Sequence, residues 1–420
     1  MTSSAAPAGP TVVVVVGASL AGATVATTLR AEGWTGRIVL VGDEEHLPYE
    51  RPPLSKAYLQ GTAERSTVFV HPADWYDEHD VELRLGRTVT AVDRDSREVL
   101  LDDGERIGWT DLVLATGSRP RLLDVPGAGL DGVHYLRRLE DSDELADAFV
   151  AADRLAIVGG GWIGLEAAAA ARGAGLEVTV LEVAELPLLR VLGPRVATIL
   201  AELHREHGVD LRTGVQVSEL LTEDGRSVSG VRLADGSTVA ADAVLVGIGI
   251  VPNVSLAADA GLEVDDGIVV DEHLRTADPH VLAIGDVADA LHPVLHRRLR
   301  VEHWANATRQ GEVAARTILG IDAVDARLPF FFTDQYDLGM EYVGHVEPGR
   351  SDEVVLRGDV AGRELLAFWV RTDGAGSGTV LAGATINIWD VSERIEALIV
   401  SGRTVDLARL ADPDVPLDEL

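Results

Sequence analysis

The sequence of 420 residues contains no cysteine. This absence excludes disulfide bonds, thiolate metal sites, an iron–sulfur cluster bound by the chain itself, and a cysteine nucleophile. Any redox chemistry would therefore have to use a bound cofactor or another protein.

Positive charge is also scarce, because 36 Lys and Arg residues face 68 Asp and Glu residues, and the net charge is −32. Nucleic acid and anionic membrane surfaces are therefore unfavourable partners. No apolar segment is long enough to span a bilayer, and Met1 to Pro10 lacks the basic and apolar regions of a signal peptide. We expect a cytoplasmic protein of two or three domains, since 420 residues exceed one hydrophobic core.

Glycine, in contrast, is abundant, and the first of two clusters follows the β-branched run Val12–Val16. This run predicts a strand buried in a parallel sheet, and a helix after Gly17-Ala18-Ser19-Leu20-Ala21-Gly22 and a strand at Arg37–Val41 complete a βαβ unit. Small residues allow the backbone to approach a pyrophosphate at the helix N-terminus. Asp43 would then bind an adenosine ribose, although Ser19 stands where a second glycine is usual.

The second cluster repeats this pattern in the middle of the chain. The strand Leu155–Val158 leads into Gly159-Gly160-Gly161-Trp162-Ile163-Gly164, a helix is expected over 165–171, and a strand ends at Glu182. An acid at this strand end accepts hydrogen bonds from the free ribose 2′-hydroxyl of NAD and repels the 2′-phosphate of NADP. The sequence thus favours NADH at the second unit.

Three further apolar strands end in small residues, and the pattern changes beyond about Asp325. Strands, a hairpin tip at 374–378 and a helix near 392–401 indicate a separate α+β domain there. We predict an α/β protein with two Rossmann-like dinucleotide-binding domains, one inserted in the other, and a C-terminal α+β domain. The predicted boundaries are 1–117 with 250–324 for the first domain, 118–249 for the second and 325–420 for the third.

Several short segments resemble one family in order along nearly the whole chain. They are Gly42-Asp43-Glu44-Glu45, Arg51-Pro52-Pro53-Leu54-Ser55-Lys56, Ala115-Thr116-Gly117-Ser118-Arg119-Pro120, Ala283-Ile284-Gly285-Asp286-Val287-Ala288, Val301-Glu302-His303-Trp304-Ala305-Asn306-Ala307 and Thr333-Asp334-Gln335-Tyr336-Asp337. The resemblance is to the FAD- and NADH-dependent ferredoxin reductases of oxygenase and cytochrome P450 systems, which have the glutathione-reductase-like fold.

The resemblance implies FAD and NADH as cofactors and a [2Fe–2S] or other small ferredoxin as electron acceptor. This ferredoxin would serve a P450 or Rieske-type oxygenase, and the reductase would be a monomer or homodimer. Asp43 would bind the FAD ribose, Asp286 the ribityl chain, and Trp304 would lie at the flavin. The implied cofactor-binding residues are Gly17, Ser19, Ala21, Gly22, Asp43, Arg51, Lys56, Val89, Ala115, Thr116, Gly117, Arg137, Asp286, Glu302, Trp304, Gly159, Gly161, Ile163, Gly164, Glu166, Glu182, Arg190, Gly247, Ile248 and Gly249.

The candidate catalytic residues are Lys56 and Glu166, which resemble a pair that meets near the flavin in this family. We hypothesise that the pair orders the site and tunes hydride transfer. From its surroundings alone, Lys56 would be a solvated surface lysine. In the Phe330–Thr333 segment, phenylalanine replaces the tryptophan that family members often carry, which puts an electron-conduit role there in doubt.

Two groups of side chains have competing interpretations. The basic run His296-Arg297-Arg298-Leu299-Arg300 is either a local docking patch for an acidic ferredoxin or a set of arginines paired with the chain's own carboxylates. His204 and His207, with Glu202 and Glu206 around them, are expected to form a solvated helix face rather than a metal site.

Other functions remain open on the sequence alone. The absence of cysteine excludes disulfide reductases and the related peroxidases and oxidases that need a thiol. Rubredoxin reduction and NADH-dependent quinone or oxygen reduction stay possible. So does a redox-dependent binding role like that of apoptosis-inducing factor, which the segment Val301-Glu302-His303 faintly resembles.

Overall fold

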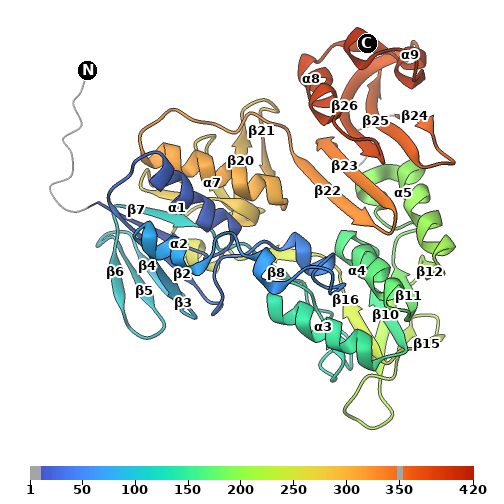
Figure 1. The fold of residues 1–420 in the computed structure, drawn as a ribbon, viewed down its shortest axis with the longest axis horizontal. Helices are drawn as coiled ribbons and strands as arrows, with labels where there is room; N and C mark the ends of the chain where they lie inside the picture. Colours follow the sequence, from blue (N-terminus) through green and yellow to red (C-terminus); the bar gives the residue numbers. More distant parts are fainter. Residues whose placement is uncertain (1–10, 348–352) are drawn as a thin grey trace. The chain divides into compact units, whose positions relative to one another are not determined.

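A computed structural model describes residues 11–347 and 353–420 (Figure 1). The segment Met1 to Pro10, for which we expect no signal peptide, lies outside these residues. The chain divides into two compact units, and each is continuous in space but not in sequence. Unit 1 comprises Met1–Glu50, Arg65–Arg119 and Val251–Arg327, and unit 2 comprises Arg51–Glu64, Pro120–Ile250 and Leu328–Leu420. Among the described residues, no helix combines the length and apolarity needed to cross a membrane.

Unit 1 is built on a five-stranded parallel sheet in the order β19-β7-β1-β2-β3. Its strands are β1 (Val12–Val16), β2 (Arg37–Gly42), β3 (Val81–Leu85), β7 (Asp111–Leu114) and β19 (Val281–Ala283). Four of the five valines of β1 are buried, as expected for a central strand. The helix α1 (Leu20–Ala31) connects β1 to β2 and packs against α7 (Trp304–Ile318).

Two smaller sheets and four short helical segments complete unit 1. One sheet contains β4 (Val89–Asp93), β5 (Glu98–Leu101) and β6 (Arg106–Gly108), and the other contains β18 (Ile268–Val270), β20 (Ala288–His292) and β21 (Arg297–Arg300). The short helical segments are η2 (Arg65–Val68), α2 (Ala73–Glu78), α6 (Ser255–Asp259) and η3 (Gly285–Val287). β8 (Ser118–Pro120) and β17 (Ile250–Pro252) lie where the chain passes between the units.

Unit 2 contains a second five-stranded parallel sheet, in the order β12-β11-β10-β16-β9. Its strands are β9 (Val133–His134), β10 (Arg154–Val158), β11 (Glu177–Glu182), β12 (Asp210–Thr213) and β16 (Ala243–Val246). α4 (Trp162–Gly173) joins β10 to β11, and α5 (Leu189–Glu206) follows, with a break in its helical geometry at Gly193. η1 (Pro52–Ser55), α3 (Leu139–Ala151) and the small sheet β13 (Val217–Leu221), β14 (Gly230–Leu233) and β15 (Thr238–Ala240) complete this part.

The C-terminal part of unit 2 is an antiparallel sheet in the order β22-β23-β26-β25-β24, to which β27 adds beside β26. The strands are β22 (Phe330–Gln335), β23 (Leu338–Gly344), β24 (Glu353–Asp359), β25 (Glu364–Thr372), β26 (Ser377–Ile386) and β27 (Thr404–Asp406). α8 (Ser392–Ser401), α9 (Leu407–Ala411) and η4 (Leu417–Glu419) follow the sheet. β22 packs against α4, and one apolar cluster joins this sheet to α5 (Figure 1).

These elements confirm the predicted fold class of two Rossmann-like units and a C-terminal α+β region. The predicted helix at 392–401 matches α8, and the predicted hairpin tip lies between β25 and β26. The second glycine-rich helix begins at Trp162, three residues before its predicted start, because the glycine cluster itself forms the first turn. The predicted three-domain boundaries stay a prediction.

Candidate cofactor and catalytic site

The first glycine cluster forms a tight turn that requires glycine at two positions. Gly17 has a φ of +123°, and a Cβ atom there would lie 2.0 Å from the Ala115 carbonyl oxygen. A Cβ atom at Gly22 would lie 2.2 Å from the Gly17 carbonyl oxygen. Any side chain would collide with backbone at both positions, so the strand, turn and helix can pack this closely only with glycine.

The N-terminal turn of α1 has the donor chemistry that a dinucleotide pyrophosphate needs. Ser19, its N-cap, makes no capping hydrogen bond and donates its hydroxyl to the Tyr49 carbonyl oxygen at 3.3 Å. The first turn carries no acidic residue. Its backbone N–H groups and the positive end of the helix dipole therefore suit an anion. Asp43 follows the end of β2, where a carboxylate suits a ribose.

The other implied flavin residues lie at strand and helix ends of unit 1. Asp286 is in η3, directly after β19, and the Gly285 N–H donates to Gln310 at 2.8 Å. Trp304 is the first residue of α7 and is 39% exposed. Its indole hydrogen-bonds to the Glu50 carboxyl, whose pKa is raised by burial. A helix N-terminus at this position could stabilise negative charge on a reduced flavin.

The second glycine cluster repeats the geometry of the first in unit 2. Gly159 has a φ of +107°, and its Cβ atom would lie 2.3 Å from the Gly247 carbonyl oxygen. At Gly164 the corresponding distance to the Gly159 carbonyl oxygen is 2.2 Å. Gly161 differs, because the nearest atom to its Cβ position beyond its two chain neighbours is the Gly247 carbonyl oxygen, 3.9 Å away. The protein itself leaves room at Gly161, which fits a ligand that approaches the loop there.

Glu182 is held beside this second loop by two backbone N–H groups. One carboxylate oxygen accepts from the Gly160 N–H at 2.6 Å, and the other accepts from the Ala184 N–H at 2.7 Å. The carboxylate is therefore fixed at the end of β11, where the acid of a dinucleotide-binding unit binds a ribose. Arg190 lies nearby in sequence, in the first turn of α5, and is exposed.

Unit 2 brings the two candidate catalytic residues into direct contact. The Lys56 ammonium lies 2.8 Å from Glu166 Oε2, and their side chains are 16% and 5% exposed. The ammonium also lies 5.5 Å from the centre of the Phe332 ring. Lys56 is thus not the solvated surface lysine that its local sequence indicates. A buried ion pair needs further hydrogen bonds to offset its loss of hydration.

Two hydroxyl groups that the sequence analysis does not assign provide those bonds. Ser55 donates to Glu166 Oε2 at 2.5 Å, and Thr333 donates to Glu166 Oε1 at 2.6 Å. Ser55 precedes Lys56 in the resemblance segment, so its proximity has a sequence signal. Thr333 is the first residue of the family-like segment Thr333-Asp334-Gln335-Tyr336-Asp337. The sequence suggests no role for this segment.

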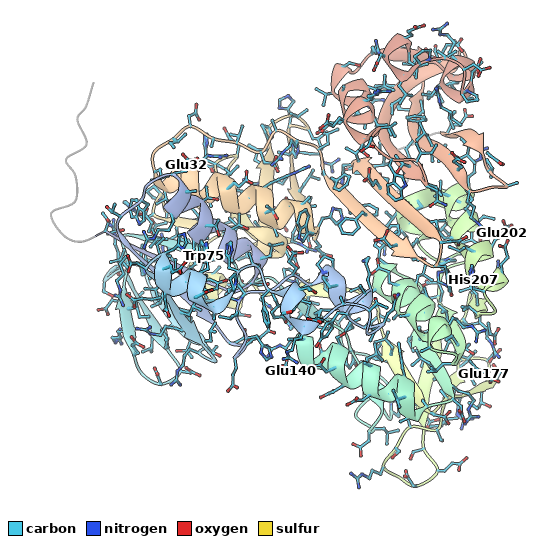
Figure 2. The ribbon with its side chains drawn as sticks, viewed as in Figure 1. Glu32, Trp75, Glu140, Glu177, Glu202 and His207 are labelled. Carbon is cyan, nitrogen blue, oxygen red and sulfur yellow. The ribbon has the colours of Figure 1, made fainter. Side chains whose placement is uncertain are left out.

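The expectation that His204 belongs to a solvated helix face is wrong. His204 is completely buried, and its Nε2 lies 2.8 Å from Gln335 Oε1. Burial lowers the pKa of His204 to about 4. Glu202 and Glu206 are exposed as expected, and Figure 2 labels Glu202 on α5 and His207 directly after the end of this helix. The prediction failed because the charged neighbours cover only one side of the helix.

Two arginines of the basic run make contacts within unit 1. Arg300 pairs with Asp266 at 3.1 Å and with Glu302, and its side chain is 11% exposed. Arg298 donates to the carbonyl oxygens of Val270 at 2.7 Å and Asp289 at 3.0 Å. These contacts favour the structural interpretation for Arg298 and Arg300.

The implied cofactor residues divide between the two units. Unit 1 holds Gly17, Ser19, Ala21, Gly22, Asp43, Val89, Ala115, Thr116, Gly117, Asp286, Glu302 and Trp304, and unit 2 holds the others. Thr116 donates its hydroxyl to the Asn253 carbonyl oxygen at 2.8 Å, and Arg51 donates to the Arg137 carbonyl oxygen. Val89 is buried in the apolar core of unit 1, at the start of β4. Their binding roles stay predictions.

Comparison with known families assigns almost the whole chain. Residues 11–311 match the pyridine nucleotide-disulphide oxidoreductase family, and residues 330–420 match the reductase C-terminal family. The first family name refers to disulfide chemistry, which this chain cannot perform because it has no cysteine.

Curated relatives and a solved structure agree with this assignment. Putidaredoxin reductase CamA of Pseudomonas putida is 40% identical over 97% of this chain and 96% of its own length. Rhodocoxin reductase of Rhodococcus erythropolis is 42% identical over 83% of this chain and 81% of its own. The covalent putidaredoxin reductase–putidaredoxin complex contains a chain that is 39% identical, with a TM-score of 0.92 and 97% of both chains covered. The ferredoxin–NAD(+) reductase component of the p-cumate 2,3-dioxygenase system of Pseudomonas putida is 40% identical over 96% of this chain and 97% of its own.

Proposed function

This chain belongs to the pyridine nucleotide-disulphide oxidoreductase family, as an FAD-dependent enzyme that uses NADH, and we propose that it passes electrons from NADH to a small iron–sulfur ferredoxin. Its relatives of similar length are ferredoxin reductases of P450 and dioxygenase systems, and a solved complex pairs one such reductase with putidaredoxin. The observation that carries the proposal is the pair of fitted glycine turns, each followed by a strand-end acid, in a chain without thiols.

We assign FAD to unit 1 and NADH to unit 2. In unit 1, the α1 N-terminus would hold the FAD pyrophosphate, Asp43 the adenosine ribose and Asp286 the ribityl chain. In unit 2, the α4 N-terminus would hold the NADH pyrophosphate, and Glu182 would bind the adenosine ribose. Within the predicted domains, these sites lie in 1–117 with 250–324 and in 118–249. We also propose that the protein acts in the cytoplasm.

When bound, FAD would supply the conversion of a two-electron hydride donor into single electrons. The chain's own residues have electrostatic and positioning tasks. The α7 N-terminus with Trp304 would favour negative charge at the flavin, while Lys56 and Glu166 would order the groups around the nicotinamide. None of these tasks requires a proton transfer. The C-terminal region would contribute Phe332, which is 37% exposed beside Lys56, to the reaction site.

The proposed role of the Lys56–Glu166 pair is testable by removing the ammonium group. In Lys56→Ala, the Glu166 carboxylate loses its cation while keeping the hydroxyl groups of Ser55 and Thr333. We expect slower reduction by NADH and weaker charge-transfer absorption. Unchanged values for both quantities would show that the pair has no role in hydride transfer.

The acceptor is tested by steady-state cytochrome c reduction with NADH and a panel of small ferredoxins. A rate that depends on one ferredoxin and saturates with its concentration supports the proposal. Rubredoxin replaces ferredoxin as the acceptor if it gives the higher kcat/KM. Fast quinone or oxygen reduction with no stimulation by any iron–sulfur protein contradicts the proposal. Slow NADH reduction with a redox-dependent change of oligomer would favour the binding role considered above.

A further inference from the structure

The strand β22 presents three alternate side chains to the helices of the nucleotide-binding part of unit 2. Phe331 packs on Trp162 of α4 with ring centres 4.8 Å apart, Thr333 bonds to Glu166 of α4, and Gln335 bonds to His204 of α5. Two residues of a strand span about 6.7 Å, and four residues of a helix rise about 6 Å. The spacing from Phe331 to Thr333 therefore matches the spacing from Trp162 to Glu166.

The polar members of this contact form one continuous, buried chain of hydrogen bonds. Thr333 lies 2.6 Å from Glu166, Gln335 Nε2 lies 3.1 Å from Thr333 Oγ1, and His204 Nε2 lies 2.8 Å from Gln335 Oε1. Glu166, Thr333, Gln335 and His204 are each at most 5% exposed. Burying so many polar groups is costly unless every one is hydrogen-bonded, as here.

The direction of each hydrogen bond follows from the carboxylate at one end. An ionised Glu166 only accepts, so Thr333 uses its single proton on Glu166 and must accept from the Gln335 amide N–H. This fixes the Gln335 amide with its oxygen toward His204. His204, which is neutral when buried, must then carry its proton on Nε2, and its Nδ1 can accept from the Tyr336 hydroxyl at 3.4 Å.

We propose that Thr333, Gln335 and His204 form a positioning chain that fixes the Glu166 carboxylate, and through it the Lys56 ammonium, for hydride transfer from NADH. The inference rests on the proposed NADH reaction for its kinetic consequence. It gives the C-terminal region a part in flavin reduction, in addition to any part in binding the acceptor.

Donors on both sides hold the Glu166 carboxylate in one orientation. Its two oxygens receive Lys56 and Ser55 on one side and Thr333 on the other. Without the Thr333 hydroxyl, Oε1 loses the hydrogen bond that Thr333 donates to it, and the carboxylate can rotate away from Lys56. A hydrogen bond to a charged group is stronger than one between neutral groups, so its loss should lower a rate that depends on it about tenfold.

Anaerobic rapid mixing of the holoenzyme with NADH separates positioning from folding. Thr333→Val keeps the shape but removes the hydroxyl, and we expect the limiting rate of flavin reduction to fall about tenfold, with the NADH Kd changing about twofold or less. Thr333→Ser keeps the hydroxyl and should restore most of the rate. Thr385→Val is the matched control, because Thr385 is equally buried in the same sheet and is not a member of the proposed positioning chain. Gln335→Met breaks the next link and tests the same idea if Thr333→Val folds poorly.

A second readout does not depend on activity. Nitrogen-15 NMR of histidine-labelled protein, with His204 assigned by its loss in His204→Gln, should show Nε2 protonated and Nδ1 unprotonated. Thr333→Val releases the Gln335 amide and should shift the His204 ring signals, whereas Thr385→Val should not. In the Lys56→Met background, Thr333→Val should lower the rate of flavin reduction only slightly further, because both substitutions act through Glu166.

Three results would overturn the positioning chain. They are a His204 proton on Nδ1, a Thr333→Val rate no lower than that of Thr385→Val, and rate losses of Thr333→Val and Lys56→Met that multiply. If NADH does not reduce the flavin of the wild-type protein, the proposed function is wrong. The NMR result would still show whether Thr333, Gln335 and His204 form the proposed hydrogen-bond chain.

Discussion

The two glycine-rich βαβ units of this protein have the same backbone design but different surroundings. In unit 1, α1 packs against α7, and Gly311 of α7 is so close that a Cβ atom there would lie 2.9 Å from the Ala21 carbonyl oxygen. In unit 2, α4 packs against β22, and the contact includes the buried carboxylate of Glu166. The contact on α1 includes a close approach through glycine, whereas the contact on α4 combines an aromatic pair with hydrogen-bonded polar groups.

This difference shows that the two glycine turns share their backbone geometry but not the elements that pack on the helix after each turn. Gly17 and Gly159 have the same structural role. At each position the turn lies so close to a backbone carbonyl oxygen that a side chain would collide with it. The side chains around the helix differ between the two units, because different elements pack against it. For α4, β22 supplies Thr333, and η1 supplies Ser55 and the adjoining Lys56, all to one carboxylate.

The largest predicted effect distinguishes Gly159, which the backbone packing requires, from Gly161, which we expect to face NADH. Gly159→Ala places a Cβ atom against a backbone oxygen at a positive φ, and we expect the free energy of unfolding to fall by about 3 kcal/mol. Gly161→Ala should cost at most about 1 kcal/mol, because the helix N-cap position there is open. It should weaken NADH binding instead, which urea unfolding and NADH titration together would reveal. Equal losses of stability would contradict the distinction.

The next prediction concerns acid and the polar packing of unit 2. His204 has a pKa of about 4 when folded and about 6.5 when unfolded, so only the unfolded chain gains a proton between these values. The contribution of His204 to the free energy of unfolding is therefore fully present above about pH 6.5. It falls as the pH drops toward 4, by about 3 kcal/mol in total. His204→Gln should remove this part of the pH dependence in denaturant unfolding. An identical slope in the variant and the wild type would refute the assignment.

The smallest predicted effect lies on the hairpin β20–β21 of unit 1. Arg298 and Arg300 bind oxygen atoms of the unit itself, and Arg297 at the start of β21 is the position at which we test the alternative, local steering of an acidic ferredoxin. Arg297→Glu should raise the KM for ferredoxin about threefold at low salt and leave ferricyanide reduction unchanged, since charges at an interface rim mainly alter association rates. Equal changes with both acceptors would exclude docking at this position.

The sequence predicts the parts of this structure that depend on neighbouring residues. The valine run, both glycine turns and the acids at the ends of β2 and β11 are local patterns, and each lies in the expected place. The family resemblance likewise pointed to Lys56 and Glu166, and the structure brings them together across more than a hundred residues of chain. Their role in the reaction stays a prediction.

The contacts around Glu166 could not be predicted in this way, because they join residues 111 and 167 positions apart in the sequence. His204 did carry a missed signal. It lies four residues after Leu200 and eight after Val196, both fully buried, and so belongs to the apolar stripe of α5. A histidine in such a stripe needs a buried partner, and only the distant strand β22 could reveal it as Gln335.

The assignment of one dinucleotide to each unit is tested most directly by comparing Asp43→Ala with Glu182→Ala. For each variant, the bound FAD per chain after gel filtration and the NADH Kd would be measured side by side. We expect Asp43→Ala to lose FAD with little change in NADH affinity, and Glu182→Ala to keep FAD while its NADH Kd rises about tenfold, as for one lost charge-assisted interaction. Loss of FAD from Glu182→Ala, or weakened NADH binding by Asp43→Ala with FAD retained, would contradict the assignment.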